Sequence, residues 1–99
     1  MKIEETYVDY IVLLDAIETY GEQKQMDMVV EECAELINAV MKFRRGRCEV
    51  KDITTEMADV VIMIAQLAKI LNLNAYELED EIARKMDRLK KRLSEGRAK

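Results

Sequence analysis

Two pairs of acidic residues with the same spacing are the part of this sequence that could do chemistry. The first pair is Glu32 and Glu35, and the second is Glu56 and Asp59. Each pair lies in a long segment whose apolar residues recur with the period of an α-helix. At about 100° per residue, both pairs fall roughly 60° and 120° from the apolar stripe of their helix. The pattern predicts two matched acidic edges beside the core.

The short connection between these two helices predicts that the acidic edges meet. It consists of Arg-Arg-Gly-Arg at positions 44–47. So short a link makes the two helices antiparallel neighbours. Glu35 and Glu56 are equidistant along the chain from the middle of this link, and so are Glu32 and Asp59. At an interaxial distance of about 8–10 Å, side chains from both helices can reach a common ion.

These four carboxylates favour a hard metal cation. Negative charges at close range repel each other, and partial burial strengthens the repulsion because the effective dielectric constant falls. The chain has no His, and an oxygen-only ligand set suits Mg²⁺, or Mn²⁺, rather than zinc. We expect the metal to be held by Glu32, Glu35, Glu56 and Asp59. The alternative is that they are solvated side chains of amphipathic helices, which the matched register of two pairs disfavours.

The residue types also limit the kinds of reaction that this chain could catalyse. Without His, and without a plausible Ser or Cys nucleophile, we expect neither covalent catalysis nor acid–base catalysis by imidazole. A ferritin-like di-iron centre needs Glu-x-x-His motifs, which this chain lacks. Carboxylate-bound magnesium can act on phosphate esters by neutralising phosphate charge and lowering the pKa of an attacking water. Glu31 or Glu35 is then a candidate to orient or deprotonate that water.

Two basic residues occupy the corresponding positions on the last predicted helix. Lys85 and Arg88 lie roughly 60° and 120° from Ile82, which belongs to the apolar stripe of that helix. We expect them to bind phosphate oxygens that a metal does not cover. The alternative is a basic C-terminal half-helix favoured by the helix dipole. The stripe itself comprises Leu78, Ile82, Met86, Leu89 and Leu93.

Composition predicts a single all-α domain over residues 1–99. Hydrophobic residues make up 49% of the chain, Pro is absent, and the three Gly stand at positions 21, 46 and 96, where helices would end. We expect a four-helix bundle-like chain with antiparallel helices. The predicted helices run from Ile3 to about Tyr20, from Glu22 or Lys24 to Arg45, from the stretch Glu49–Asp52 through Leu71, and from a cap at Asn74 to about Ser94, with a frayed tail at 97–99.

The first predicted helix is apolar around so much of its circumference that we expect a homo-oligomer. Its main face is widened by Val8, Val12 and Leu13, and a small protein needs a second surface to cover so wide an arc. The main face comprises Tyr7, Tyr10, Ile11, Leu14 and Ile17.

The charge and the cysteines of the chain restrict its possible partners and its cellular compartment. The net charge of −4 argues against a nucleic-acid polymer as partner. The apolar runs are too short to span a membrane, and the start has no signal-peptide pattern. Cys33 and Cys48 form no C-x-x-C motif, which favours reduced cysteines and a cytoplasmic protein.

In these motifs the chain resembles the MazG-type all-α nucleoside triphosphate pyrophosphohydrolases over about residues 20–93. The resemblance implies hydrolysis of an NTP or dNTP between the α- and β-phosphates, giving the monophosphate and pyrophosphate. It implies Mg²⁺ on the four carboxylates, phosphate held by Lys85 with help from Arg88, and a dimer or tetramer with sites completed near subunit contacts. The matching segments are Gln25, Glu31-Glu32-Cys33-Ala34-Glu35-Leu36, Arg45-Gly46 and Glu56-Met57-Ala58-Asp59-Val60.

Two alternatives to this reaction are less favoured. A phosphoribosyl-ATP pyrophosphohydrolase usually carries Tyr-His soon after the Glu-x-x-Asp motif, where this chain has Val-Val-Ile-Met at positions 60–63. A non-catalytic helical module for oligomerisation or nucleotide sensing would have no reason to keep the complete acidic set in matched register. The sequence therefore favours a nucleoside triphosphate pyrophosphohydrolase over both.

Overall fold

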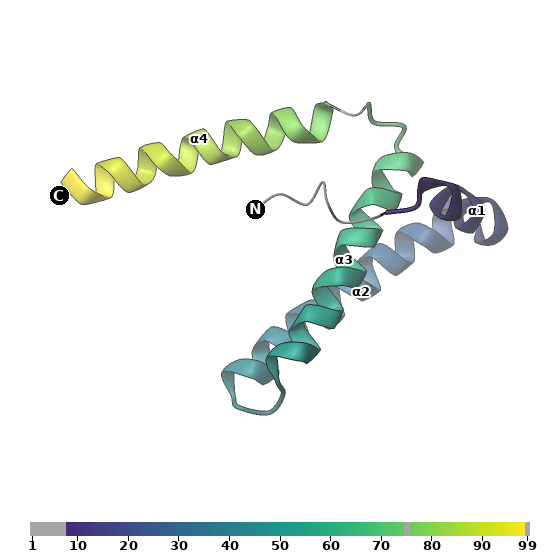
Figure 1. The fold of residues 1–99 in the computed structure, drawn as a ribbon, viewed down its shortest axis with the longest axis horizontal. Helices are drawn as coiled ribbons and strands as arrows, with labels where there is room; N and C mark the ends of the chain where they lie inside the picture. The colour runs from purple at the N-terminus through teal and green to yellow at the C-terminus, as the bar shows by residue number, and fades with distance from the viewer. Residues whose placement is uncertain (1–7, 75, 99) are drawn as a thin grey trace.

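The protein consists of four α-helices in a computed structural model that describes residues 8–74 and 76–98 (Figure 1). The described residues contain no strand, so the predicted all-α class and the number of helices are confirmed. None of the described helices combines the length and the apolar character that a membrane crossing requires. In chain order the helices are α1 (Tyr10–Tyr20), α2 (Glu22–Arg44), α3 (Val50–Ile70) and α4 (Glu77–Ala98).

Helix α1 begins later than predicted. Val8 and Asp9 are not helical, and the Asp9 carboxylate caps the helix by accepting bonds from the backbone N–H groups of Ile11 (3.0 Å) and Val12 (3.3 Å). The predicted start at Ile3 is therefore wrong for residues 8 and 9, while the rest of that segment, Tyr7 included, lies outside the described residues. The apolar pattern runs across the cap, which is why periodicity alone did not reveal it.

Two glycines end helices where predicted, and the third does not. Gly21 has a φ of 90° and Gly46 a φ of 71°, a region of backbone space that glycine adopts without strain. The Gly46 N–H donates to the carbonyl of Phe43 at 2.9 Å, which closes the end of α2. Gly96 lies inside α4, so the predicted end near Ser94 is wrong, and Arg97 and Ala98 continue the helix.

The start of α4 matches the predicted capping arrangement. The Asn74 side-chain carbonyl accepts the N–H groups of Tyr76 (2.9 Å) and Glu77 (3.1 Å), and its amide donates to the Glu77 carboxylate at 3.2 Å. At α3, the Glu49 N–H donates to the Asp52 carboxylate at 2.8 Å. Polar side chains at both helix starts thus satisfy backbone groups that a helix leaves free.

Helices α2 and α3 form a hairpin. Helix α1 packs on both of them near the open end of this hairpin (Figure 1). The most buried residues of α2 and α3 include polar side chains. On α2, Gln25 and Ala39 are buried, and half-buried Glu32 lies midway, seven residues from each. On α3, Gln66 is only 1% exposed, and half-buried Asp59 stands seven residues before it. A spacing of seven is expected where two helices pack side by side.

The apolar stripes that periodicity predicts on α2 and α3 are turned partly outward. They comprise Val29, Cys33, Leu36, Val40 and Phe43 on α2, and Met57, Val60, Ile64 and Leu67 on α3, followed by its C-cap Leu71. Val40 and Phe43 on α2 are exposed, as are Met57 and Ile64 on α3. Glu32, Glu56 and Asp59, which were predicted to lie beside these stripes, are themselves half-buried. The acidic residues thus lie nearer the helix–helix contact than their predicted place beside it.

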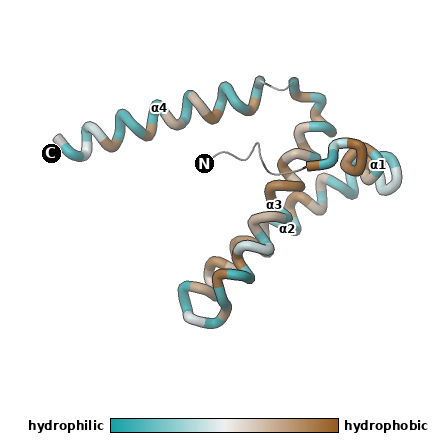
Figure 2. Tube along the Cα trace, in the orientation of Figure 1, coloured by the Kyte–Doolittle hydropathy of each residue, from teal (hydrophilic) through white to brown (hydrophobic). Residues whose placement is uncertain are grey.

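Helix α4 stands apart from the other three. Within the described residues it makes no contact with α1, α2 or α3, and Figure 1 shows it projecting away from the hairpin. The radius of gyration is 16.5 Å, compared with about 13 Å for a compact chain of this length. Its apolar stripe, visible as recurring hydrophobic residues in Figure 2, is exposed, with Ile82 52% exposed. The prediction of a four-helix bundle within one chain is therefore wrong.

Candidate functional site

Three of the four predicted metal ligands come together on the hairpin. One carboxylate oxygen each from Glu32, Glu35 and Glu56 lies within 4.8 Å of the other two. Glu32 and Glu35 are one turn apart on α2, and Glu56 comes from α3. Metal–oxygen distances in proteins are about 2.0–2.6 Å, so oxygens this close can surround a single cation. We refer to Glu32, Glu35 and Glu56 as the acidic cluster.

The remaining predicted carboxylates lie around this acidic cluster. Asp59 is half-buried one turn after Glu56, and it contributes no oxygen to the close group. Its charge nevertheless acts on both Glu32 and Glu56. Glu31 is exposed and lies outside the group, whereas Glu35, the other candidate base, belongs to it.

Among the described residues, none neutralises the charges of Glu32 and Glu56. The Oε2 atoms of Glu32 and Glu56 are buried and accept no hydrogen bond within the described part of the chain. Burial raises the pKa of Glu32, and the negative charges of Glu35, Asp59 and Glu56 raise it further. Burial also raises the pKa of Glu56, with Glu35 and Asp59 adding to the effect. A buried oxygen without a partner is costly, so the acidic cluster fits a cation that would complete its contacts.

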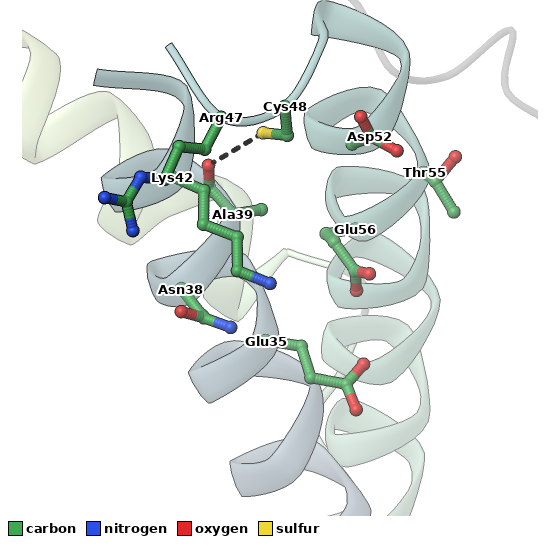
Figure 3. Close-up of a pocket in the computed structure, with 9 residues that line it drawn as sticks. All are labelled: Glu35, Asn38, Ala39, Lys42, Arg47, Cys48, Asp52, Thr55 and Glu56. Carbon is green, nitrogen blue, oxygen red and sulfur yellow. Dashed lines mark hydrogen bonds between the residues drawn. The ribbon is translucent and has the colours of Figure 1, made fainter. Parts of the chain in front are cut away.

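A cavity of about 400 Å³ opens beside Glu35 and Glu56 (Figure 3). Its walls come from the second half of α2, the α2–α3 connection and the first turns of α3. Two cationic residues, Lys42 and Arg47, line it together with the carboxylates. The Cys48 thiol donates to the carbonyl of Ala39 at 3.4 Å, which ties the connection to α2 at the edge of the cavity.

The two predicted phosphate-binding residues lie elsewhere in the chain. Lys85 and Arg88 are exposed on α4, which contacts none of the three other described helices. A single copy therefore does not bring them to the acidic cluster. On the same helix, Arg84 pairs with Glu81, which lowers the pKa of that carboxyl through hydrogen bonding to the guanidinium.

A family model for the MazG nucleotide pyrophosphohydrolase domain matches residues 20–94. The chain belongs to this family. The matched region of the MazG domain covers α2, α3 and most of α4, so it includes all the predicted site residues. Searches of curated proteins and of solved structures found no match. MazG domains generally use a divalent metal, the kind of ion to which the oxygen ligands of the acidic cluster are suited.

The cavity contains residues of this MazG domain that the sequence pattern did not single out. Lys42 follows Glu35 by seven residues on α2, and Arg47 lies in the connection. Seven residues are about two helical turns, so spacing alone places Lys42 on the same face as Glu35. This signal was hidden because the basic stretch 42–47 resembles an ordinary helix end stabilised by the dipole.

Proposed function

We propose that this MazG domain hydrolyses nucleoside triphosphates, either NTPs or dNTPs, to the monophosphate and pyrophosphate. The observation that carries the proposal is the convergence of Glu32, Glu35 and Glu56 within 4.8 Å in a chain of this family. Three carboxylates at this distance have no structural use as a group, because they repel each other and leave buried oxygens without partners.

Mg²⁺, or alternatively Mn²⁺, would be held by the acidic cluster, with Asp59 completing the ligand set from the next turn of α3. All of these ligands are carboxylate oxygens, which both ions accept. When bound, the ion would neutralise phosphate charge and lower the pKa of a water molecule. The two buried Oε2 atoms of Glu32 and Glu56 support this assignment, since a cation would give them the partner they lack.

A carboxylate of the site would act as the base that accepts the proton of the attacking water. Water attacks the α-phosphorus, and a carboxylate accepts its proton. The bond from the α-phosphorus to the bridging oxygen breaks, and its electron pair leaves with pyrophosphate. Glu35 is the better candidate for the base because it is exposed and lines the cavity, whereas Glu31 lies outside the close group.

Phosphate binding by Lys85 and Arg88 would require a second copy of the chain. We propose a homodimer or homotetramer in which α4 of one copy lies on the hairpin of another. The exposed surface of one chain is 8427 Å², compared with about 5,800 Å² for a compact monomer of this mass. Basic residues on α4 and carboxylates on the hairpin also have the complementary charges that such a contact needs.

A pyrophosphate-release screen over the ribo- and deoxynucleoside triphosphates, with Mg²⁺ and Mn²⁺, tests the proposed reaction. We expect pyrophosphate rather than orthophosphate from at least one nucleotide, and no release by Glu56→Gln. Absence of release from every nucleotide by the folded protein would overturn the proposal. Release of orthophosphate alone would contradict cleavage at the α-phosphate.

A complementation experiment tests the role of the second copy. Glu56→Gln lacks one carboxylate of the acidic cluster, and Lys85→Ala lacks one phosphate-binding cation of α4, so we expect each to be inactive alone. Refolded together, they would form some sites that combine an intact acidic cluster with an intact Lys85 from the other copy, and activity would return. Verified mixed oligomers that stay inactive would contradict the proposed arrangement.

A further inference from the structure

Lys42 is positioned to act inside the cavity next to the acidic cluster. Figure 3 shows its side chain running along α2 into the space between α2 and α3, with the amino group on the side of Glu56. The guanidinium of Arg47 points away from α3 in the same view. Of the two cations that line the cavity, Lys42 is therefore the one whose charge is directed into it.

Lys42 forms no ion pair with another described residue. In residues 8–74 and 76–98, the one ion pair joins Arg84 to Glu81, so Lys42 has no carboxylate partner. Three carboxylates, of Glu35, Asp52 and Glu56, line the same cavity. The cavity thus holds more negative than positive charge, and it would accept an anion only when a metal ion neutralises the acidic cluster.

The lining of the cavity favours phosphate over a nucleobase. Its described lining contains no aromatic ring, so it offers no surface on which a base could stack. It does offer the Lys42 ammonium and the Asn38 amide, which are donors for phosphate oxygens. Its volume of about 400 Å³ falls within the usual range for small-molecule sites.

We propose that Lys42 binds the β- and γ-phosphates of the substrate, which leave as pyrophosphate, in the cavity beside the acidic cluster. This inference rests on the proposed function, because it assigns one end of the triphosphate to a place in the same site. When the bond to the α-phosphorus breaks, its electron pair stays on the leaving pyrophosphate, and the Lys42 ammonium lies where it would offset that charge. The nucleoside would then extend away from the cavity.

Titration calorimetry with pyrophosphate in the presence of Mg²⁺ tests the assignment. We expect Lys42→Gln to weaken binding by about tenfold or more, which is the usual loss for one charge-assisted hydrogen bond, and Lys42→Arg to retain most of the affinity. Lys51→Gln is the matched control, because it removes the same charge from an exposed position at the start of α3 that does not line the cavity. Circular dichroism would establish that all variants remain helical.

Equal affinity of Lys42→Gln and the unaltered protein would overturn the inference, as would equal weakening by Lys51→Gln. Failure of the unaltered protein to bind pyrophosphate with Mg²⁺ would also overturn it. The nucleotide screen separates this result from failure of the proposed function. If the protein hydrolyses no nucleotide yet binds pyrophosphate through Lys42, the phosphate site stands and the reaction does not. If Lys42→Gln retains unchanged turnover, KM and pyrophosphate inhibition, the reaction stands and the phosphate site does not.

Discussion

Glu32 on α2 and Glu56 on α3 present carboxylate oxygens within 4.8 Å of each other across the helical hairpin. The Oε2 atom of each is buried without a hydrogen-bond partner in the described residues. Like charges at this separation oppose the packing of the two helices unless protons or a cation neutralise them. The stability of the hairpin should therefore report directly on the state of the acidic cluster.

We expect the metal-free protein to become more stable as the pH falls from neutral toward 4.5, the ordinary pKa of a glutamate. The folded state raises the pKa of Glu32 and Glu56, so over this range it binds protons more readily than the unfolded chain. Stability is then lost as the pH rises through the folded-state pKa. Melting temperatures measured with a chelator should show a flatter profile in the double variant Glu32→Gln, Glu56→Gln. An unchanged slope in that variant would contradict protonation of these two glutamates as the cause.

Mg²⁺ should raise the melting temperature at neutral pH. An ion that binds only the folded state stabilises it by about 2.7 kcal/mol when its concentration is one hundred times the dissociation constant. Glu56→Gln should lose this response, whereas Glu79→Gln, a matched change on exposed α4, should keep it. A response that is equally weak or equally strong in both variants would argue against binding at the acidic cluster.

Substitution of Asp59 should reduce turnover less than substitution of Glu56. Glu56 offers an oxygen to the close group, whereas Asp59 acts from the next turn. We expect Asp59→Asn to lower kcat/KM by at least about tenfold and Glu56→Gln by at least about a hundredfold. Asp27→Asn, an exposed change on α2, serves as the control and should leave the rate unaltered. Equal activity of Asp59→Asn and Asp27→Asn would exclude Asp59 from the site.

Disruption of the apolar stripe on α4 should break the proposed oligomer. Leu89→Asp puts a charge in the middle of that stripe, while Lys91→Asp puts the same side chain on the other side of the helix. Light scattering after size-exclusion chromatography should show a monomer near 11.5 kDa for the first variant and an oligomer for the second. Monomers for the unaltered protein at high concentration would refute self-association.

We expect the buried side chain of Gln66 on α3 to stabilise the packing of α1 on the hairpin. The Gln66 amide donates to the carbonyl of Leu13 at 3.5 Å, and its side chain is fully enclosed. We expect Gln66→Ala to lower the free energy of unfolding by about 2 kcal/mol, through the lost hydrogen bond and packing. Gln23→Ala, on the exposed face of α2, should change it by less than about 0.5 kcal/mol. Urea titrations of both variants would show whether the difference exists.

The features that the sequence predicted well depend on neighbouring residues. Gly21 and Gly46 end helices because their backbone conformation suits glycine, and Asn74 caps α4 with its own side chain. The closeness of Glu35 and Glu56 follows from their register on either side of a short connection. Their role as metal ligands remains a prediction.

The features that the sequence missed depend on how separate elements of the chain are arranged in space. An apolar stripe such as that of α4 has the same pattern whether it packs within one copy or between two. The burial of the polar residues Gln25, Glu32 and Gln66 cannot be predicted from hydrophobic periodicity, because periodicity assigns the packed face to apolar residues. Lys42 was missed because its surroundings suggested a helix end rather than a cavity.

The separation of α4 from α1, α2 and α3 has a consequence for how the protein would work. Under the proposed assembly, a solitary copy holds the carboxylates without the cations of a neighbouring α4. Specific activity would therefore fall on dilution, and the abundance of the protein would set a threshold below which nucleotides are left intact.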